Sequence, residues 1–188
     1  MPTEVEYYTE ISDYLRTSIL DNIVEFGSFI VDFIPCSRID LRIGINEFMR
    51  RNSIQDSNLR EFAELCRGLK IDILGIIYSV DKKQGIVIIC EIKMGSLSLN
   101  DYSQLIGYCI ASDTPYGLLI GIDGQKSHDF KLALIQKPAL IEITRTNDIS
   151  HNFGICCWNS HTKKLIFDND GAFESTSQLI REFVYNFY

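Results

Sequence analysis

Two apolar runs joined by a short polar turn constrain the fold of this chain more than any other feature. The runs read LKIDILGIIYSV over residues 69–80 and GIVIICEIK over residues 85–93, and DKKQ lies between them. β-Branched residues dominate both runs and show no helical spacing, so each run predicts a strand. Because both runs are apolar on both faces, we expect buried, central strands of a sheet.

Three charged residues interrupt these predicted strands: Asp72, Glu91 and Lys93. A charge inside a buried strand is costly unless it has a partner or a function. A two-residue turn at 81–82 sets Asp72 opposite Glu91, and a four-residue loop over 81–84 sets Asp72 opposite Lys93. Either connection places the three side chains on one face of the sheet. A three-residue loop separates Asp72 from the other two.

The chemistry of these residue types favours a magnesium site. Two neighbouring carboxylates repel each other, so they need a cation between them. Hard oxygen ligands that converge at one end of a sheet suit Mg²⁺ best. A lysine two residues from a metal-bound carboxylate can hold or polarise an attacking water and offset developing negative charge. The residues therefore predict a Mg²⁺ site at Asp72 and Glu91, with Lys93 beside it.

Asp72, followed on the next strand by Glu91-Ile92-Lys93, resembles the core of the PD-(D/E)xK nuclease superfamily, which includes many restriction endonucleases. Ile71 stands where the family name has proline. The resemblance implies that Asp72 and Glu91 bind one or two Mg²⁺ ions, with the carbonyl of Ile92 as a further ligand. It also implies that Lys93 orients or deprotonates the water that attacks a DNA phosphodiester.

Two helical patterns extend the resemblance. Gln104 and Tyr108 are four residues apart on one helical face and resemble the Q-x-x-x-Y helix of many members, in which Gln104 would position Lys93, the water or the phosphate. The pattern EVEYYTEISDYL resembles the opening helix of many members, where a glutamate can reach the metal. Glu4 matches that position best and Glu10 less well, although acidic residues also favour a helix N-terminus for structural reasons alone.

The order of predicted elements agrees with an α/β fold, a mixed central β-sheet flanked by helices with the αβββαβ core of these nucleases. A crossover helix makes the strand at 116–122 parallel to the strand that carries Glu91. The expected elements of the core are a helix at 4–20, strand structure at 28–43, helices within 45–67, the strands at 69–93, a helix ending near 111 and the strand at 116–122. Beyond the core we expect a short helix at 127–137, strands at 140–144, 154–159 and 164–168, and a closing helix at 174–187.

Size indicates a single domain over residues 1–188, which the resemblance implies is a nuclease domain, and charge indicates that this domain does not bind DNA alone. The net charge is −7 and the isoelectric point is about 4.9, whereas phosphate contacts need clustered Lys and Arg. The most basic portion carries Arg50, Arg51, Arg60 and Arg67. The resemblance implies double-stranded DNA as the substrate, and the acidity of the chain leads us to expect a larger subunit that supplies DNA recognition.

Location and redox state follow from other sequence features. The chain has no apolar run of about 18 residues, which predicts no membrane span. Its first ten residues are acidic and polar, unlike a secretory signal. The six cysteines form no C-x-x-C pair and several lie in apolar runs, as reduced core cysteines do. We therefore expect a cytoplasmic protein.

Within the superfamily, the chain looks most like the cleavage domain of a type IIS restriction endonuclease. Its small size and acidity fit the small subunit of a heterodimeric enzyme, which cuts one strand while a larger partner reads the site and nicks the other. Two alternatives remain open. One is a stand-alone, homodimeric repair or resolvase-type nuclease, and the other is a non-catalytic assembly subunit with the same fold.

Overall fold

The fold is built on a seven-stranded mixed sheet with the strand order β1-β2-β3-β4-β6-β5, in which β7 also pairs with β6. The structure, a computed structural model, describes residues 3–144 and 150–187. The strands are β1 (Phe29–Pro35), β2 (Ile73–Ser79), β3 (Gln84–Met94), β4 (Tyr116–Ile122), β5 (Glu142–Thr144), β6 (Ser150–Asn159) and β7 (Lys164–Phe167). Pairing is parallel between β3 and β4 and between β4 and β6, and antiparallel elsewhere.

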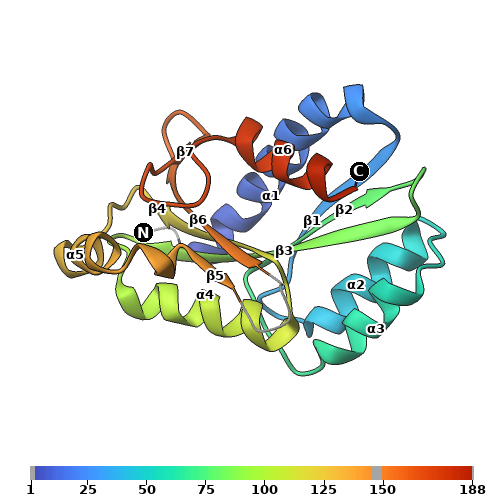
Figure 1. The fold of residues 1–188 in the computed structure, drawn as a ribbon, viewed down its shortest axis with the longest axis horizontal. Coiled ribbons are helices and arrows are strands. Elements are labelled where there is room, and N and C mark those ends of the chain that lie inside the picture. The colour runs from blue at the N-terminus through green and yellow to red at the C-terminus, as the bar shows by residue number, and fades with distance from the viewer. Residues whose placement is uncertain (1–2, 145–149, 188) are drawn as a thin grey trace.

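Helices cover both faces of the sheet (Figure 1). Helices α1 and α6 lie on one face, and α2, α3 and α4 lie on the other. Their bounds are α1 (Glu4–Ile23), α2 (Leu41–Arg51), α3 (Ser57–Leu65), α4 (Leu99–Ser112), α5 (His128–Gln136) and α6 (Thr176–Phe187), with short 3₁₀ turns at Val24–Phe26 and Pro138–Leu140. The predicted α/β class and the mixed sheet flanked by helices are therefore confirmed.

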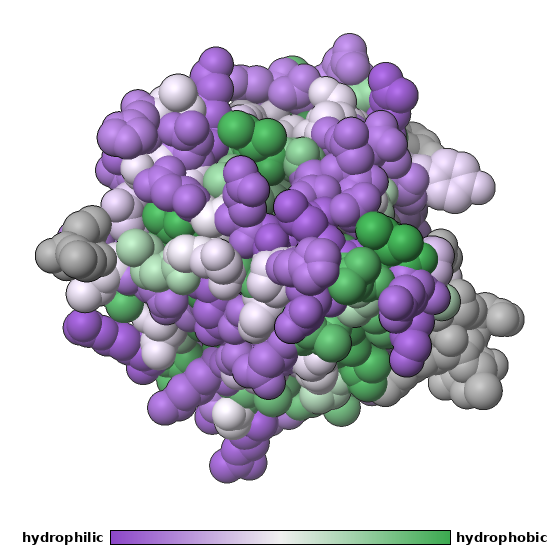
Figure 2. Space-filling model, turned by 90° about the vertical axis from the view of Figure 1, so that its left-hand side faces the viewer, coloured by the Kyte–Doolittle hydropathy of each residue, from purple (hydrophilic) through white to green (hydrophobic). Residues whose placement is uncertain are grey.

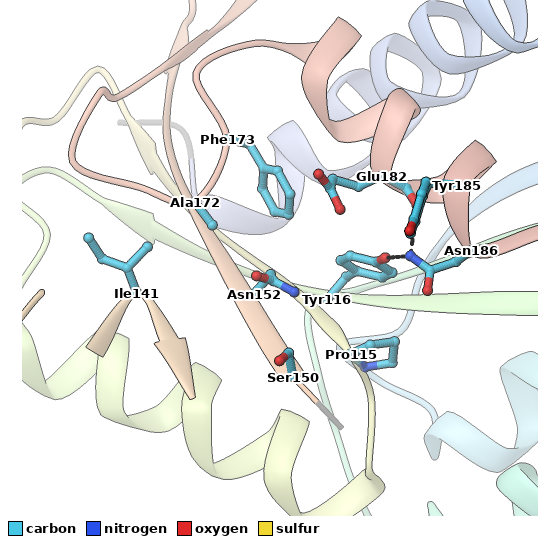
Figure 3. A pocket seen from close by; sticks show the side chains of 10 residues that line it. All are labelled: Pro115, Tyr116, Ile141, Ser150, Asn152, Ala172, Phe173, Glu182, Tyr185 and Asn186. Atoms are coloured by element: carbon cyan, nitrogen blue, oxygen red, sulfur yellow. Dashed lines mark hydrogen bonds between the residues drawn. The ribbon is translucent and has the colours of Figure 1, made fainter. Parts of the chain in front are cut away.

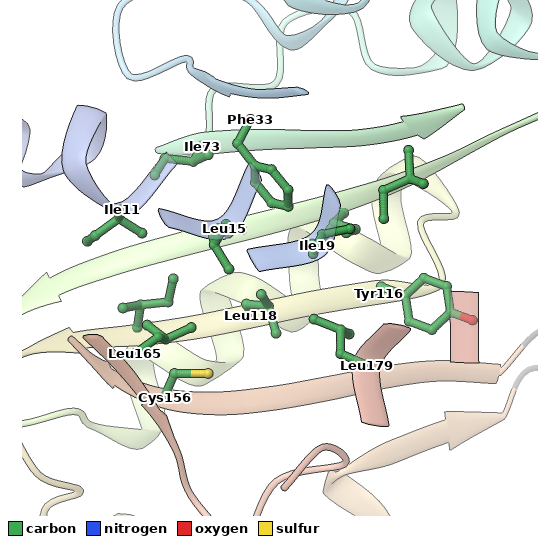
Figure 4. Packing of buried hydrophobic residues seen from close by; sticks show 14 of the residues in the cluster. Ile11, Leu15, Ile19, Phe33, Ile73, Tyr116, Leu118, Cys156, Leu165 and Leu179 are labelled. Atoms are coloured by element: carbon green, nitrogen blue, oxygen red, sulfur yellow. The ribbon is translucent and has the colours of Figure 1, made fainter. Parts of the chain in front are cut away.

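The central strands are buried because a hydrophobic core lies on each side of them. Every residue of β2 and β4 is buried, as their apolar sequence predicted. On one face, Ile11, Leu15 and Ile19 project from α1 onto the sheet (Figure 4). Leu179 of α6 joins the same cluster, and so do Phe183 and Phe187, so these aromatic residues near the end of the chain pack on the core. The other face carries its own cluster beneath α2, α3 and α4.

Several expected boundaries differ from those observed. The predicted strand region 28–43 ends at Pro35, on the edge strand β1, and α2 begins at Leu41. Asp40 is the N-cap of α2, and its Oδ1 accepts the Arg42 N–H at 2.9 Å. Asp56 caps α3, because its Oδ1 accepts the N–H groups of Asn58 and Leu59 in the first turn. These caps satisfy amides that the helices leave unpaired.

Two further features concern the cysteines and the character of the helices. The six cysteines are free, and all but Cys157 are buried. Among the helices of the described residues, none has the length and apolar character needed to cross a membrane.

Candidate active site

The register of the β2–β3 hairpin places Asp72 beside Glu91. Ser79 pairs with Gln84 at the turn and Ile73 pairs with Cys90 at the other end. Continuing this ladder by one residue sets Asp72 opposite Glu91, which is the arrangement expected from the two-residue turn. The side chains of such directly opposite residues lie on the same face. Asp72 itself lies in a bend just before β2, where the ladder stops.

The Asp72 carboxylate accepts two hydrogen bonds at the end of the sheet where β2 begins. Its Oδ2 accepts the Ile92 N–H at 2.8 Å, and its Oδ1 accepts the Tyr8 hydroxyl at 2.6 Å. The N–H and C=O of one strand residue face the same edge of that strand. The Ile92 carbonyl therefore also faces the edge where β2 has ended, on the side of Asp72. This arrangement gathers the oxygen atoms of Asp72, Glu91 and Ile92 at one open end of the sheet.

Glu91 and Lys93 form an ion pair on β3. The Lys93 Nζ donates to Glu91 Oε1 at 2.7 Å, and the side chains are 24% and 3% exposed respectively. Burial, together with the negative charge of Asp72, raises the pKa of Glu91 to about 7. Burial opposes the charge of Lys93, but the hydrogen bond to Glu91 and the nearby carboxylates outweigh it and raise the pKa of Lys93. The carboxylates of Asp72 and Glu91 therefore share one cation, Lys93, and the three side chains together carry a net negative charge when both carboxylates are ionised.

The raised pKa of Glu91 predicts a pH-dependent stability in metal-free buffer. Between pH 4.5 and pH 7 the folded protein binds more protons than the unfolded chain, so its stability falls as the pH rises through that window. Relative to Glu91→Gln, we expect the wild-type protein to lose about 3 kcal/mol across it. Urea unfolding at a series of pH values with a chelator measures this difference. Parallel curves for the two proteins would contradict it.

Helix α1 reaches the same end of the sheet. Glu4 Oε1 accepts the Met94 N–H at 3.0 Å, and the charge of Glu4 adds to the raised pKa of Glu91. Glu10, the lesser candidate from the sequence, lies elsewhere: it forms an exposed ion pair with Lys163 in the β6–β7 turn. Of the two glutamates, the structure brings only Glu4 to the candidate site.

Gln104 and Tyr108 lie on one face of α4, as predicted, and interact with each other. Gln104 Nε2 donates to the Tyr108 hydroxyl at 3.0 Å. Within residues 3–144 and 150–187, no hydrogen bond joins Gln104 to Lys93. Helix α4 starts soon after β3 ends, and its N-cap Ser98 forms a capping box with Asp101. The predicted role of Gln104 in positioning Lys93 therefore stays a prediction.

The donor set at the end of β3 fits a hard, oxygen-binding cation. The carboxylates of Asp72 and Glu91 share one cation, Lys93, and so keep a net negative charge, and the Ile92 carbonyl faces the same edge. Mg²⁺ commonly takes one or two carboxylates and keeps several waters. In the described part of the chain, no three His, Cys, Asp or Glu side chains are grouped closely enough to hold a metal by themselves. A bound Mg²⁺ would thus use two carboxylates, a carbonyl and water.

The arginines on α2 and α3 are partly neutralised by acidic neighbours. Arg50 pairs with Glu47 at 2.7 Å, and Arg51 pairs with Asp32 at 3.2 Å. Arg60 and Arg67 are exposed. This portion of the surface therefore offers less free positive charge to a phosphate backbone than its arginine content suggests.

A cavity lies away from these residues, at the opposite end of β4. It measures about 650 Å³, and Tyr116, Phe173, Glu182 and Asn186 are among the residues around it (Figure 3). Tyr116 begins β4, whereas Gly121, the partner of Lys93, lies near its end. Five residues of strand separate the two positions, or about 16 Å. The cavity is therefore a feature distinct from the carboxylate site.

Two contacts at the end of the sheet that carries Asp72 and Lys93 were not predicted from the sequence. The Tyr8 hydroxyl contacts Asp72, which lies 64 residues away in the sequence. The sequence indicated this contact only in that Tyr8 follows Glu4 by one helical turn. Lys126 is buried and forms ion pairs with Asp168, at 2.7 Å, and with Asp170. It ties the segment after β4 to the connection between β7 and α6. A lysine flanked by polar residues gives no sequence sign of such burial.

Comparison with known proteins gives no relative: the chain matches no family model, no curated protein and no solved structure.

Proposed function

We propose that this protein is a Mg²⁺-dependent DNA endonuclease subunit that hydrolyses phosphodiester bonds. The observation that carries the proposal is the meeting of three residues at one end of the sheet: Asp72 just before β2, and Glu91 and Lys93 on β3, in the order that the PD-(D/E)xK resemblance implies. A buried carboxylate beside a second carboxylate costs free energy, because burial and like charge both disfavour its ionised form. A carboxyl group whose pKa is raised in this way, as that of Glu91 is, is common at functional sites.

Each residue has a distinct part in the proposed hydrolysis. Asp72 and Glu91 would hold Mg²⁺, with the Ile92 carbonyl as a further ligand. When bound, the metal supplies the means to lower the pKa of water and to neutralise charge on the phosphate. Lys93 keeps its proton because its pKa is raised, so it acts as a donor that orients the attacking water and offsets negative charge in the transition state.

The charge around the site favours a partner for DNA binding. Hydrophilic residues cover most of the end of the molecule near α5, with apolar patches between them (Figure 2). Glu4 and Glu6 on α1 and Asp123 after β4 place negative charge at this end of the fold. A polyanionic duplex needs positive charge to bind. We therefore propose that a larger DNA-recognition subunit supplies affinity and specificity, and that this chain cuts one strand.

Plasmid cleavage in Mg²⁺ tests the function directly. We expect no cutting by the purified chain alone, and cutting of one strand when it is mixed with a large subunit encoded beside it. A chelator should abolish the activity. Robust cutting by the chain alone would contradict the need for a partner. Absence of cutting in every mixture, together with no Mg²⁺ binding by calorimetry, would contradict the nuclease assignment.

A further inference from the structure

Helix α1 carries a tyrosine whose hydroxyl reaches Asp72. Tyr8 is 3% exposed and belongs to the core cluster beneath α1 and α6. Its hydroxyl donates to Asp72 Oδ1 at 2.6 Å, a short distance typical of a hydrogen bond to a charged acceptor. Because the ring is packed in the core, the position of the hydroxyl is fixed by the fold of α1 on the sheet.

Two donors from separate elements therefore hold the Asp72 carboxylate. Tyr8 binds Oδ1 from α1, and the Ile92 N–H binds Oδ2 from β3 at 2.8 Å. Together they prevent rotation of the carboxylate plane about the Cβ–Cγ bond. An ionised carboxylate has about four lone-pair sites, so each oxygen keeps the capacity to accept a further ligand. The carboxylate is thus oriented without being saturated.

We propose that Tyr8 is a positioning residue that holds Asp72 in the orientation required to bind Mg²⁺. The inference rests on the proposed function, because it needs Asp72 to be a metal ligand. Hydrogen-bond partners of ligating carboxylates commonly change metal affinity by about 10–100-fold when they are removed. Tyr8 would act through Asp72 and would not touch the substrate.

Tyr8→Phe removes the hydroxyl and keeps the ring that packs in the core. We expect the Mg²⁺ dissociation constant of the isolated chain, measured by calorimetry with MgCl₂, to rise about tenfold. The matched control is Tyr14→Phe on the same helix. Tyr14 packs edge-on against Trp158 at a centroid distance of 5.5 Å, and its hydroxyl has no hydrogen-bond partner among the described residues. That variant should bind Mg²⁺ like the wild type.

Asp72→Asn separates failure of this inference from failure of the proposed function. If Asp72→Asn loses Mg²⁺ binding while Tyr8→Phe binds within twofold of wild type, or more tightly, the positioning role is wrong. If Asp72→Asn binds Mg²⁺ normally, the metal site itself is wrong.

If Tyr8→Phe does not fold, the inference can still be tested on proteins that keep Tyr8. Addition of Mg²⁺ should change the tyrosine ultraviolet difference spectrum of the wild type and of Tyr14→Phe, because the Asp72 oxygen bonded to Tyr8 changes its charge environment. The signal should be absent in Asp72→Asn. A wild-type protein that binds Mg²⁺ with no tyrosine signal would overturn the inference.

Discussion

Replacement of Glu91 by Ala should abolish DNA cleavage by the proposed two-subunit enzyme, with a fall in rate of at least about a thousandfold. Glu91 is the one fully buried carboxylate of the candidate site, and its side chain is 3% exposed. Its loss would remove one of two proposed carboxylate ligands and also release Lys93 from its 2.7 Å contact. Both the metal and the lysine would then be misplaced. Single-turnover cleavage of plasmid DNA in saturating Mg²⁺ measures the effect.

The fold should survive this substitution. Removal of Glu91 also removes repulsion from Asp72, which offsets the lost ion pair with Lys93. Circular dichroism and urea unfolding should therefore show a folded protein. The matched control is Glu61→Ala, which changes an exposed glutamate on α3 and should cut at the wild-type rate. A well-folded Glu91→Ala protein that cleaves normally would refute the assignment of the site.

The hairpin illustrates how far sequence alone could go. Apolar, β-branched runs predicted β2 and β3 and their burial, and both predictions are confirmed. The sequence alone left the register of the hairpin undetermined. Both strands are apolar on both faces, so shifting one strand by one residue buries no polar side chains, and burial does not select one register. The turn closes through local contacts: the Lys82 N–H donates to Ser79 Oγ at 3.2 Å, and Lys83 adopts a positive φ of 53°. A lysine in that conformation has no clear sequence signal.

The site was predictable where it depended on neighbouring strands and not where it depended on distant packing. Glu91 and Lys93 are two residues apart on one strand, and the hairpin brings Asp72 to them. Tyr8 joins the site only because α1 packs across the sheet, which spacing in the sequence does not reveal. Gln104 matched a helical motif, yet its hydrogen bond goes to Tyr108. A motif on a helix fixes which residues share a face but not what that face contacts.

Gly124→Ala should strongly destabilise the protein, by about 3 kcal/mol or more. A Cβ at this position would lie 1.6 Å from the Gly95 carbonyl oxygen, which is a backbone atom and cannot rotate away. The two segments lie close together because Leu97 N–H donates to the Gln125 carbonyl at 3.0 Å and Ser127 N–H donates to the Leu97 carbonyl at 2.8 Å. An alanine would force them apart. Urea unfolding followed by circular dichroism measures the loss.

The control for this prediction is another glycine, Gly107, for which the expected change has the opposite sign. Gly107 is exposed on α4, and a Cβ there would meet nothing within 4 Å. Alanine favours helix more than glycine does, so Gly107→Ala should stabilise the protein by about 1 kcal/mol. If both variants unfolded at the wild-type urea concentration, the close approach of the two segments would be wrong.

Gly124→Ala should also reduce cleavage, even where the protein stays folded. The Gly95 carbonyl that it displaces lies two residues after Lys93, and the Gly95 N–H is held by the Ile122 carbonyl at 3.3 Å. Lys126, buried between Asp168 and Asp170, prevents the other segment from moving away. The strain must therefore be taken up on the β3 side, where Lys93 is positioned. Cleavage measured well below the unfolding temperature of the variant would separate a displaced Lys93 from a loss of stability. An unchanged cleavage rate at that temperature would mean that the segment after Lys93 does not position this lysine.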